Sequence, residues 1–169
     1  ILAGSRILRE EGLKIFIPTI WVSILTLAVF TFLSSISTSL TTEMTIGTWL
    51  KNESFHCLWG WQLNRVTLTM ILLIIGVSSL VHIYSLSYME GDPHIGRFMS
   101  YLSLFTTFML ILVTSPNLIQ LFIGWEGVGV CSYLLINFWS TRVLASQSAF
   151  KAMAVNKVCL LYTSDAADD

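Results

Sequence analysis

The chain has 169 residues, of which 54% are hydrophobic and 11% are charged, and its formal net charge is −1. Soluble domains carry about 25% charged residues, so this composition excludes an ordinary soluble protein. The near-neutral charge argues against a nucleic-acid partner, and the three scattered cysteines lack the spacing of a disulfide framework or a metal site. We therefore expect a membrane protein that binds neither nucleic acid nor metal.

Long apolar segments recur along the chain. A helix needs about 20 mostly apolar residues to cross a bilayer. Segments with no formal charge predict three transmembrane helices, at residues 15–35, 66–89 and 98–115, and residues 118–139, with Glu126 as their one charge, predict a fourth. Residues 145–161 predict the start of a further helix. Backbone groups in lipid must be hydrogen-bonded within their own segment, which favours helices over open strands. The expected fold class is all-α, a polytopic transmembrane helix bundle.

The segments between these helices are polar or aromatic. Residues 36–65 read as a linker that is rich in serine and threonine and then in tryptophan, which favours the headgroup level of a membrane. Residues 90–97 read as a tight polar loop. Residues 162–169 follow CLL and resemble translated sequencing-adapter read-through, so we expect a non-native tail there.

Basic residues divide unequally between the two ends of the expected helices. One end carries five of them, Arg6, Arg9, Lys14, Arg97 and Arg142, and the other carries Lys51 and Arg65. The end with more Lys and Arg lies on the cytoplasmic or matrix side of a membrane. We therefore expect the N-terminal segment, residues 1–14, on the matrix side.

Glu126 is the most isolated charge in the sequence. No other Asp, Glu, Lys or Arg occurs between Arg97 and Arg142. A carboxylate at membrane depth costs at least about 2.5 kcal/mol, so such a residue is usually paired, protonated or functional. Two interpretations follow: a titratable residue that acts in transport, or a glutamate that is simply satisfied by a neighbouring helix.

One long segment resembles a known family. The sequence LVTSPNLIQLFIGWEGVGVCSYLLINFW, within residues 78–158, resembles subunit 5 of NADH dehydrogenase, a membrane subunit of respiratory complex I, in its mitochondrial form. The chain departs from the family pattern at Cys159 and Leu160, where the family carries Gly-Asp.

The resemblance implies a fragment of an antiporter-like, multi-pass subunit of the mitochondrial inner membrane. Such a subunit contributes to proton translocation by NADH:ubiquinone reductase, coupled to electron transfer from NADH to ubiquinone. Its partners are the other membrane-arm subunits of complex I, membrane lipids and protons. The resemblance implies that this chain binds no redox cofactor, because NADH, FMN, the iron–sulfur clusters and ubiquinone are bound by other subunits.

Four residues are candidates for proton transfer. Glu126 matches the buried glutamate of the family, and low dielectric favours its neutral form while an approaching cation favours its charged form. Lys157 matches the basic residue of the family motif VNRV, and it either tunes Glu126 or snorkels to an interface. Lys151 is a weaker candidate of the same kind, for which a solvated or snorkelling lysine is the favoured interpretation. His82 lies deep in a span, where a proton relay and a structural hydrogen bond to Ser78 or Ser79 are both open.

Other interpretations stay open at this point. The helix pattern is shared by multi-subunit cation/proton antiporters and membrane-bound hydrogenases, and a scaffold fragment that does not pump is a third alternative. Several uncharged polar side chains could hydrogen-bond between helices or line a water-filled path, and the sequence does not separate the two roles. They are Ser103, Thr106, Thr107, Ser132 and Asn137.

Overall fold

The structure, a computed structural model, describes residues 10–37, 42–52, 55–139 and 142–165. Its elements in chain order are α2 (Glu10–Ser37), β1 (Thr42–Asn52), β2 (Phe55–Leu63), α3 (Arg65–Tyr88), α4 (Ile95–Thr114), α5 (Leu118–Ile136) and α6 (Val143–Asp165). Most of the expected N-terminal segment 1–14 and the last four residues of the expected tail 162–169 lie outside the described part. The expected all-α class is confirmed, with one β-hairpin added between α2 and α3.

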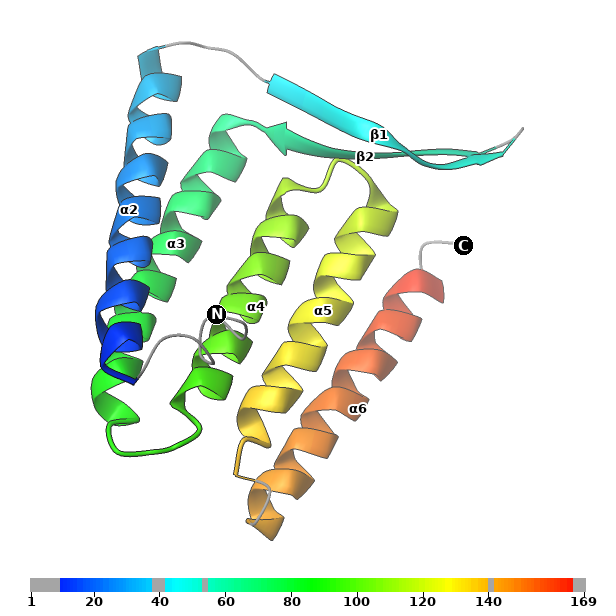
Figure 1. Ribbon diagram of the computed structural model, residues 1–169. Coiled ribbons are helices and arrows are strands. Elements are labelled where there is room, and N and C mark those ends of the chain that lie inside the picture. The colour runs from blue at the N-terminus through cyan, green and yellow to red at the C-terminus, as the bar shows by residue number, and fades with distance from the viewer. Residues whose placement is uncertain (1–9, 38–41, 53–54, 140–141, 166–169) are drawn as a thin grey trace.

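The helices stand side by side and alternate in direction, so that each packs against the next one in the chain (Figure 1). The hairpin lies across the end at which α3 begins and α4 passes into α5. The opposite end holds the start of α2, the α3–α4 turn and the start of α6. Lys14, Arg97 and Arg142 belong to this second end, whereas Lys51 and Arg65 belong to the first; Arg6 and Arg9 lie outside the described residues.

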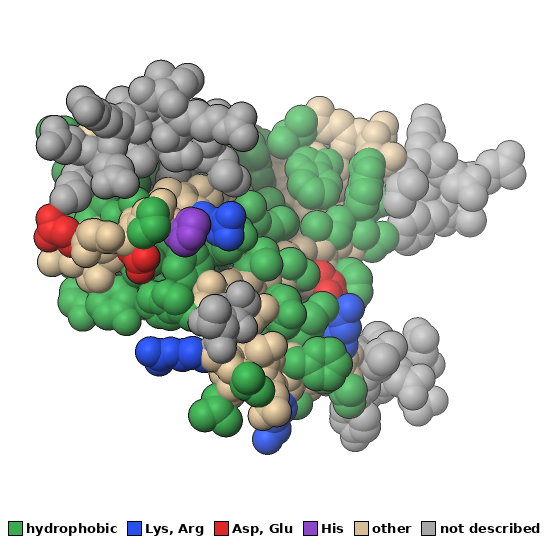
Figure 2. Space-filling view, turned by 60° about the horizontal axis from the view of Figure 1, so that its bottom comes forward, with side chains coloured by type: hydrophobic (Ala, Val, Ile, Leu, Met, Phe, Trp, Pro, Cys, Tyr) green, Lys and Arg blue, Asp and Glu red, His purple; other side chains and the backbone are tan. Residues whose placement is uncertain are grey.

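Four helical segments are long and apolar enough to cross a membrane, Ile15–Ser35, Arg65–Tyr88, Ile95–Thr114 and Leu118–Ile136. Only 17 to 22% of the residues in their most apolar windows are buried within the chain, so most of their apolar side chains are half-buried or exposed. In a view toward the end with the α3–α4 turn, hydrophobic side chains cover much of the described surface and charged ones are few (Figure 2). The chain is thus a multi-pass membrane protein whose helices form an open layer.

The hairpin is the main departure from the sequence-based expectation, because residues 36–65 were expected to be a linker and no strands were predicted there. β1 and β2 pair antiparallel from Thr42 with Leu63 to Asn52 with Phe55. The pairing skips one residue of β1 between Thr45 and Gly47 and another between Thr48 and Leu50. Alternating apolar residues in FHCLWGWQL are the signal for a strand, and the aromatic content that suggested headgroup anchoring also raises β propensity.

Two amides at the start of α5 fix the hairpin to the helices. Gln120 is 1% exposed, its Nε2 donates to the carbonyl of Gly60 at 2.9 Å, and its Oε1 accepts from the Gly60 N–H at 3.3 Å. Asn117 Nδ2 donates to the carbonyl of Leu58 at 2.6 Å. Leu58 and Gly60 are two residues apart and therefore present backbone groups on the same strand edge. The two amides satisfy an edge of β2 that would otherwise be open.

Apolar packing joins the helices at the opposite end. Ile17 and Trp21 of α2 pack with Ile95 and Met99 of α4 and with Met89, at the end of α3. This cluster holds the α3–α4 turn against α2. It lies at the same end of the bundle as Lys14, Arg97 and Arg142.

Most helix ends differ from the expected ranges by one or more residues, and α2 begins at Glu10 rather than at 15. α4 begins at Ile95 rather than at 98, because Arg97 ends the apolar span but does not interrupt a helix that continues into the headgroup region. α5 ends at Ile136 rather than at 139, with Asn137 as its C-terminal cap. α6 extends to Asp165, so its last residues enter the expected tail.

Candidate functional site

Glu126 lies in the middle of α5, within a span that carries no other charge. Its side chain is partly buried. On the α4 side, a Cβ atom at Gly124 would lie 2.8 Å from the backbone of Leu112, and one at Gly127 would overlap the ring of Phe108. These glycines let α4 and α5 approach closely, which is how small residues act between membrane helices. They hold α5, and with it Glu126, against its neighbour.

The α6 side of α5 is marked by a hydrogen bond. Trp125 Nε1 donates to Asn156 Oδ1 of α6 at 3.0 Å, and a Cβ at Gly129 would lie 2.5 Å from Asn156 Nδ2. Trp125 and Asn156 directly precede Glu126 and Lys157, so the acid and the base lie at the same level of the α5–α6 contact.

Helix geometry places these two charged residues on one flank. A residue follows its predecessor by about 100° around a helix, so Glu126 and Lys157 each turn away from the contact by about a quarter of a turn. Because α5 and α6 are right-handed and antiparallel, that step leads to the same flank of the pair. Lys157 is exposed, and within the described part of the chain no ion pair or hydrogen bond joins it to Glu126. The arrangement presents an acid beside a base without a closed salt bridge.

Lys151 is not brought to Glu126. The fully buried Ala149 and Asn156 mark the side of α6 that faces α5. Lys151 follows Ala149 by two residues, which places it about 200° away, on the far side of α6. Its side chain is exposed. Of the two lysines considered from the sequence, only Lys157 shares a flank with the glutamate.

His82 lies apart from this pair, with α4 standing between α3 and α5. Its side chain is 0% exposed, and its ring lies 4.1 Å from that of Trp21, centroid to centroid. Nδ1 is 2.7 Å from the carbonyl oxygen of Ser78 and 3.3 Å from the Ser78 hydroxyl, while Nε2 has no partner among the described residues. The structural hydrogen bond considered from the sequence is therefore present, and a relay role stays a prediction.

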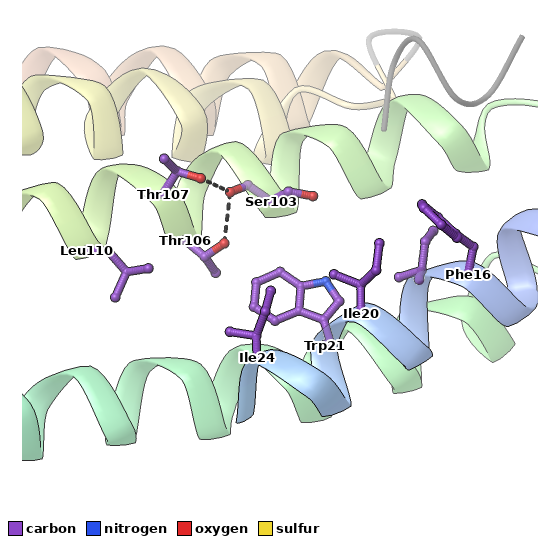
Figure 3. Close-up of a pocket in the computed structure, with 9 residues that line it drawn as sticks. Phe16, Ile20, Trp21, Ile24, Ser103, Thr106, Thr107 and Leu110 are labelled. Atoms are coloured by element: carbon purple, nitrogen blue, oxygen red, sulfur yellow. Dashed lines mark hydrogen bonds between the residues drawn. The ribbon is translucent and has the colours of Figure 1, made fainter. Parts of the chain in front are cut away.

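A cavity of about 240 Å³ opens between α2 and α4 (Figure 3). Phe16, Trp21 and Leu110 contribute to its apolar wall, and the hydroxyls of Thr106 and Thr107 both donate to the carbonyl of Ser103, at 2.8 Å each. The hydroxyl groups of this wall are thus satisfied within α4, and no charged residue is among the described ones that line the cavity.

The interpretation that polar side chains join the helices is wrong for the hydroxyls. Ser103, Thr106 and Thr107 donate within α4, and Ser132 donates to the carbonyl of Gly129 in its own helix. Hydroxyls three or four residues from a carbonyl reach it without leaving the helix. Asn137 Oδ1 is buried without a partner among the described residues.

Sequence reasoning missed the side chains that do join elements. Gln120, Trp125 and Asn156 make the hydrogen bonds from α5 to the hairpin and to α6. The available signal was the lone glutamine of an apolar helix, Gln120, since its longer side chain does not bond to its own backbone as readily as serine does.

Two family models match the chain. Residues 49–99 match "NADH-Ubiquinone oxidoreductase (complex I), chain 5 N-terminus", and residues 115–162 match "NADH:quinone oxidoreductase/Mrp antiporter, TM". The second match contains the whole of the Glu126 and Lys157 arrangement.

Relatives with the same name come from distant organisms. NADH-ubiquinone oxidoreductase chain 5 of Chondrus crispus is 59% identical over 121 residues, 72% of this chain and 18% of the relative. The protein of the same name from Metridium senile is 48% identical over 154 residues, 91% of this chain and 26% of the relative. That from Arabidopsis thaliana is 55% identical over 113 residues, 67% of this chain and 17% of the relative.

The matches therefore cover most of this chain but about a quarter or less of each relative. Both family models, the level of identity and the four apolar helices agree with one another. The chain belongs to the NADH-ubiquinone oxidoreductase chain 5 family.

Proposed function

We propose that this chain is part of an antiporter-like membrane subunit that moves protons while NADH:ubiquinone reductase transfers electrons from NADH to ubiquinone. The names of its relatives support this assignment, and they also support a location in the mitochondrial inner membrane and assembly with other complex I subunits. The electron carriers, FMN and iron–sulfur clusters, and the sites for NADH and ubiquinone then belong to other subunits.

The observation that carries the proposal is the placement of Glu126. It is the lone acid of an apolar span, partly buried, and it shares a flank with Lys157 without forming a salt bridge to it. A carboxyl group in low dielectric favours its neutral form, and a cation that approaches favours the charged form. Movement of a basic group toward or away from Glu126 would therefore make it release or take up a proton.

Lys157 is the base proposed for this role, and Lys151 is not, because it lies on the far side of α6. His82 is proposed as a separate relay between α2, α3 and α4, on the basis of its unpartnered Nε2.

The test is Glu126→Gln in the intact enzyme, reconstituted in liposomes. The amide keeps the size of the side chain but cannot ionise, so the proton-to-electron ratio is expected to fall while the complex assembles and oxidises NADH. The matched control is Glu43→Gln, since Glu43 is an exposed acid on the hairpin whose carboxylate accepts only from Gln62 among the described residues. The control should leave the ratio unchanged. An unaltered ratio in Glu126→Gln would contradict the proposal.

A second candidate function is cation/proton exchange in a multi-subunit antiporter, which the description of the second family model also includes. Co-purification separates the two: iron–sulfur subunits that oxidise NADH accompany the chain in the first case and are missing in the second. Retained pumping in Glu126→Gln, together with intact assembly, would instead favour the scaffold interpretation.

A further inference from the structure

Two residues of the α5–α6 contact have no place in the mechanism so far, although they adjoin both members of the proposed pair. We propose that Trp125 and Asn156, seated on Gly129, are positioning residues that set the distance between Glu126 and Lys157. This inference rests on the proposed function, because it assigns a role only if Glu126 exchanges protons.

The first observation is the hydrogen bond itself. Trp125 Nε1 donates to Asn156 Oδ1 at 3.0 Å, and it is a side-chain bond between α5 and α6. The indole N–H of tryptophan can only donate a hydrogen bond, and the side-chain oxygen of asparagine can only accept one, so the two groups are a matched donor and acceptor. Because the bond joins two helices inside the apolar region, it favours one rotation of each helix relative to the other.

The second observation is the absence of a side chain at Gly129. A Cβ there would lie 2.5 Å from Asn156 Nδ2, which is closer than real contacts allow. Glycine thus provides the space in which the Asn156 amide lies against α5. Trp125 and Gly129 are four residues apart and so lie on one face of α5. The side-chain amide of Asn156 contacts both: its oxygen accepts from Trp125, and its nitrogen lies against Gly129.

The third observation is the sequence position of the two partners. Each is directly followed by one member of the proposed acid–base pair, Glu126 or Lys157. A rotation of either helix about its axis would swing the following side chain toward or away from the shared flank. The hydrogen bond therefore controls the separation of the carboxyl and ammonium groups without touching the transferred proton.

The substitutions that test this inference are Trp125→Phe, which removes the donor but keeps an aromatic ring, and Asn156→Ala, which removes the acceptor. Loss of one ordinary hydrogen bond changes the population of a geometry by roughly two- to tenfold. Both variants are expected to lower the proton-to-electron ratio of the intact reconstituted enzyme while the rate of NADH oxidation is kept.

A spectroscopic readout separates positioning from a general loss of structure. The carboxyl stretch of Glu126 is assigned in redox-induced infrared difference spectra by its disappearance in Glu126→Gln. Trp125→Phe and Asn156→Ala should shift this band, because the ammonium group that perturbs it has moved. The matched control is Trp139→Phe, since the Trp139 ring contacts Tyr88 and Phe138 at the end of the bundle. It should leave the band and the ratio unchanged.

A double substitution tests the role of Gly129. Gly129→Ala should disturb the band in the parent enzyme but add nothing in the Asn156→Ala background, because the amide it would strike is gone. Such non-additivity is the signature of residues that act through one contact. Additive effects of the two substitutions would overturn this part of the proposal.

The outcomes distinguish this inference from the function on which it rests. If Glu126→Gln leaves the ratio unchanged, the proposed function fails and the positioning role fails with it. If Glu126→Gln lowers the ratio but neither Trp125→Phe nor Asn156→Ala alters the ratio or the band, only the positioning role is overturned.

Discussion

At the scale of single residues, small side chains decide how close α4 and α5 lie. A Cβ at Gly124 would meet the N, Cα and Cβ atoms of Leu112, all at 2.8 Å, and backbone cannot rotate away as a side chain can. Glu126 lies two residues farther along the same helix. The packing of a residue without charge therefore determines where the charged one lies.

Gly124→Ala is expected to destabilise the assembled protein, because overpacking of this kind costs about 1–3 kcal/mol. The control is Gly76→Ala in α3, where an added Cβ has nothing within 4 Å. The measurement is the midpoint temperature at which the detergent-solubilised complex loses NADH:ubiquinone activity, which should fall for Gly124→Ala alone. Equal midpoints in the two variants would show that α4 and α5 are not packed as closely as described.

Elements are held by a few long polar side chains. The hairpin is anchored to α5 by Gln120 and Asn117, whose amides replace the hydrogen bonds that a third strand would make to β2. An exposed strand edge can pair with another chain, so the amides of Gln120 and Asn117 both attach the hairpin to α5 and cover the edge of β2.

Gln120→Leu is expected to free β2, because it removes two hydrogen bonds and leaves the N–H and C=O of Gly60 unpaired. Each buried unpaired group costs about 1–3 kcal/mol, which corresponds to at least about tenfold faster local opening. Hydrogen exchange followed by mass spectrometry on the peptide that contains Gly60 reports this directly. The matched control is Gln62→Leu, since the Gln62 amide donates only to the exposed Glu43 among the described residues, at 3.3 Å. Similar exchange in both variants would mean that Gln120 does not anchor the strand.

At the scale of the whole molecule, the alternating helices separate two ends. Arg97 and Arg142 share one end with the α3–α4 turn, and the hairpin occupies the other (Figure 1). The more basic end is expected on the matrix or cytoplasmic side.

Thiol labelling from each side of the membrane checks this orientation. Single cysteines are placed at the exposed His94, in the α3–α4 turn, and at the exposed Thr48, in the hairpin, after the exposed Cys159 is replaced by serine. A membrane-impermeant reagent should modify His94→Cys from the matrix or cytoplasmic side and Thr48→Cys from the opposite side. Modification of both from one side would contradict the alternating arrangement.

The apolar spans could be predicted from the sequence because length and hydropathy alone decide whether a segment can cross a bilayer. Glu126 could be identified for a related reason, since placing a single acid in such a span costs free energy and therefore suggests a function. Lys157 was suggested by family resemblance, and the sequence could rank Lys151 below it but could not exclude Lys151. Six residues along a helix leave two lysines on different faces, and only the position of α5 tells which face matters.

The sequence by itself determined a polytopic membrane chain, its family and its isolated acid, since each follows from local composition or from a contiguous motif. The tertiary structure alone decided the hairpin and its clamp, the separation of His82 from Glu126 by α4, and the Trp125–Asn156 bond beside the acid–base pair. The bonds from Gln120 to the hairpin and from Trp125 to Asn156 join residues 60 and 31 positions apart in the chain, and which helix faces which is set by close packing around glycines. Hydropathy is a property of a segment, whereas contact between segments depends on the shape of both.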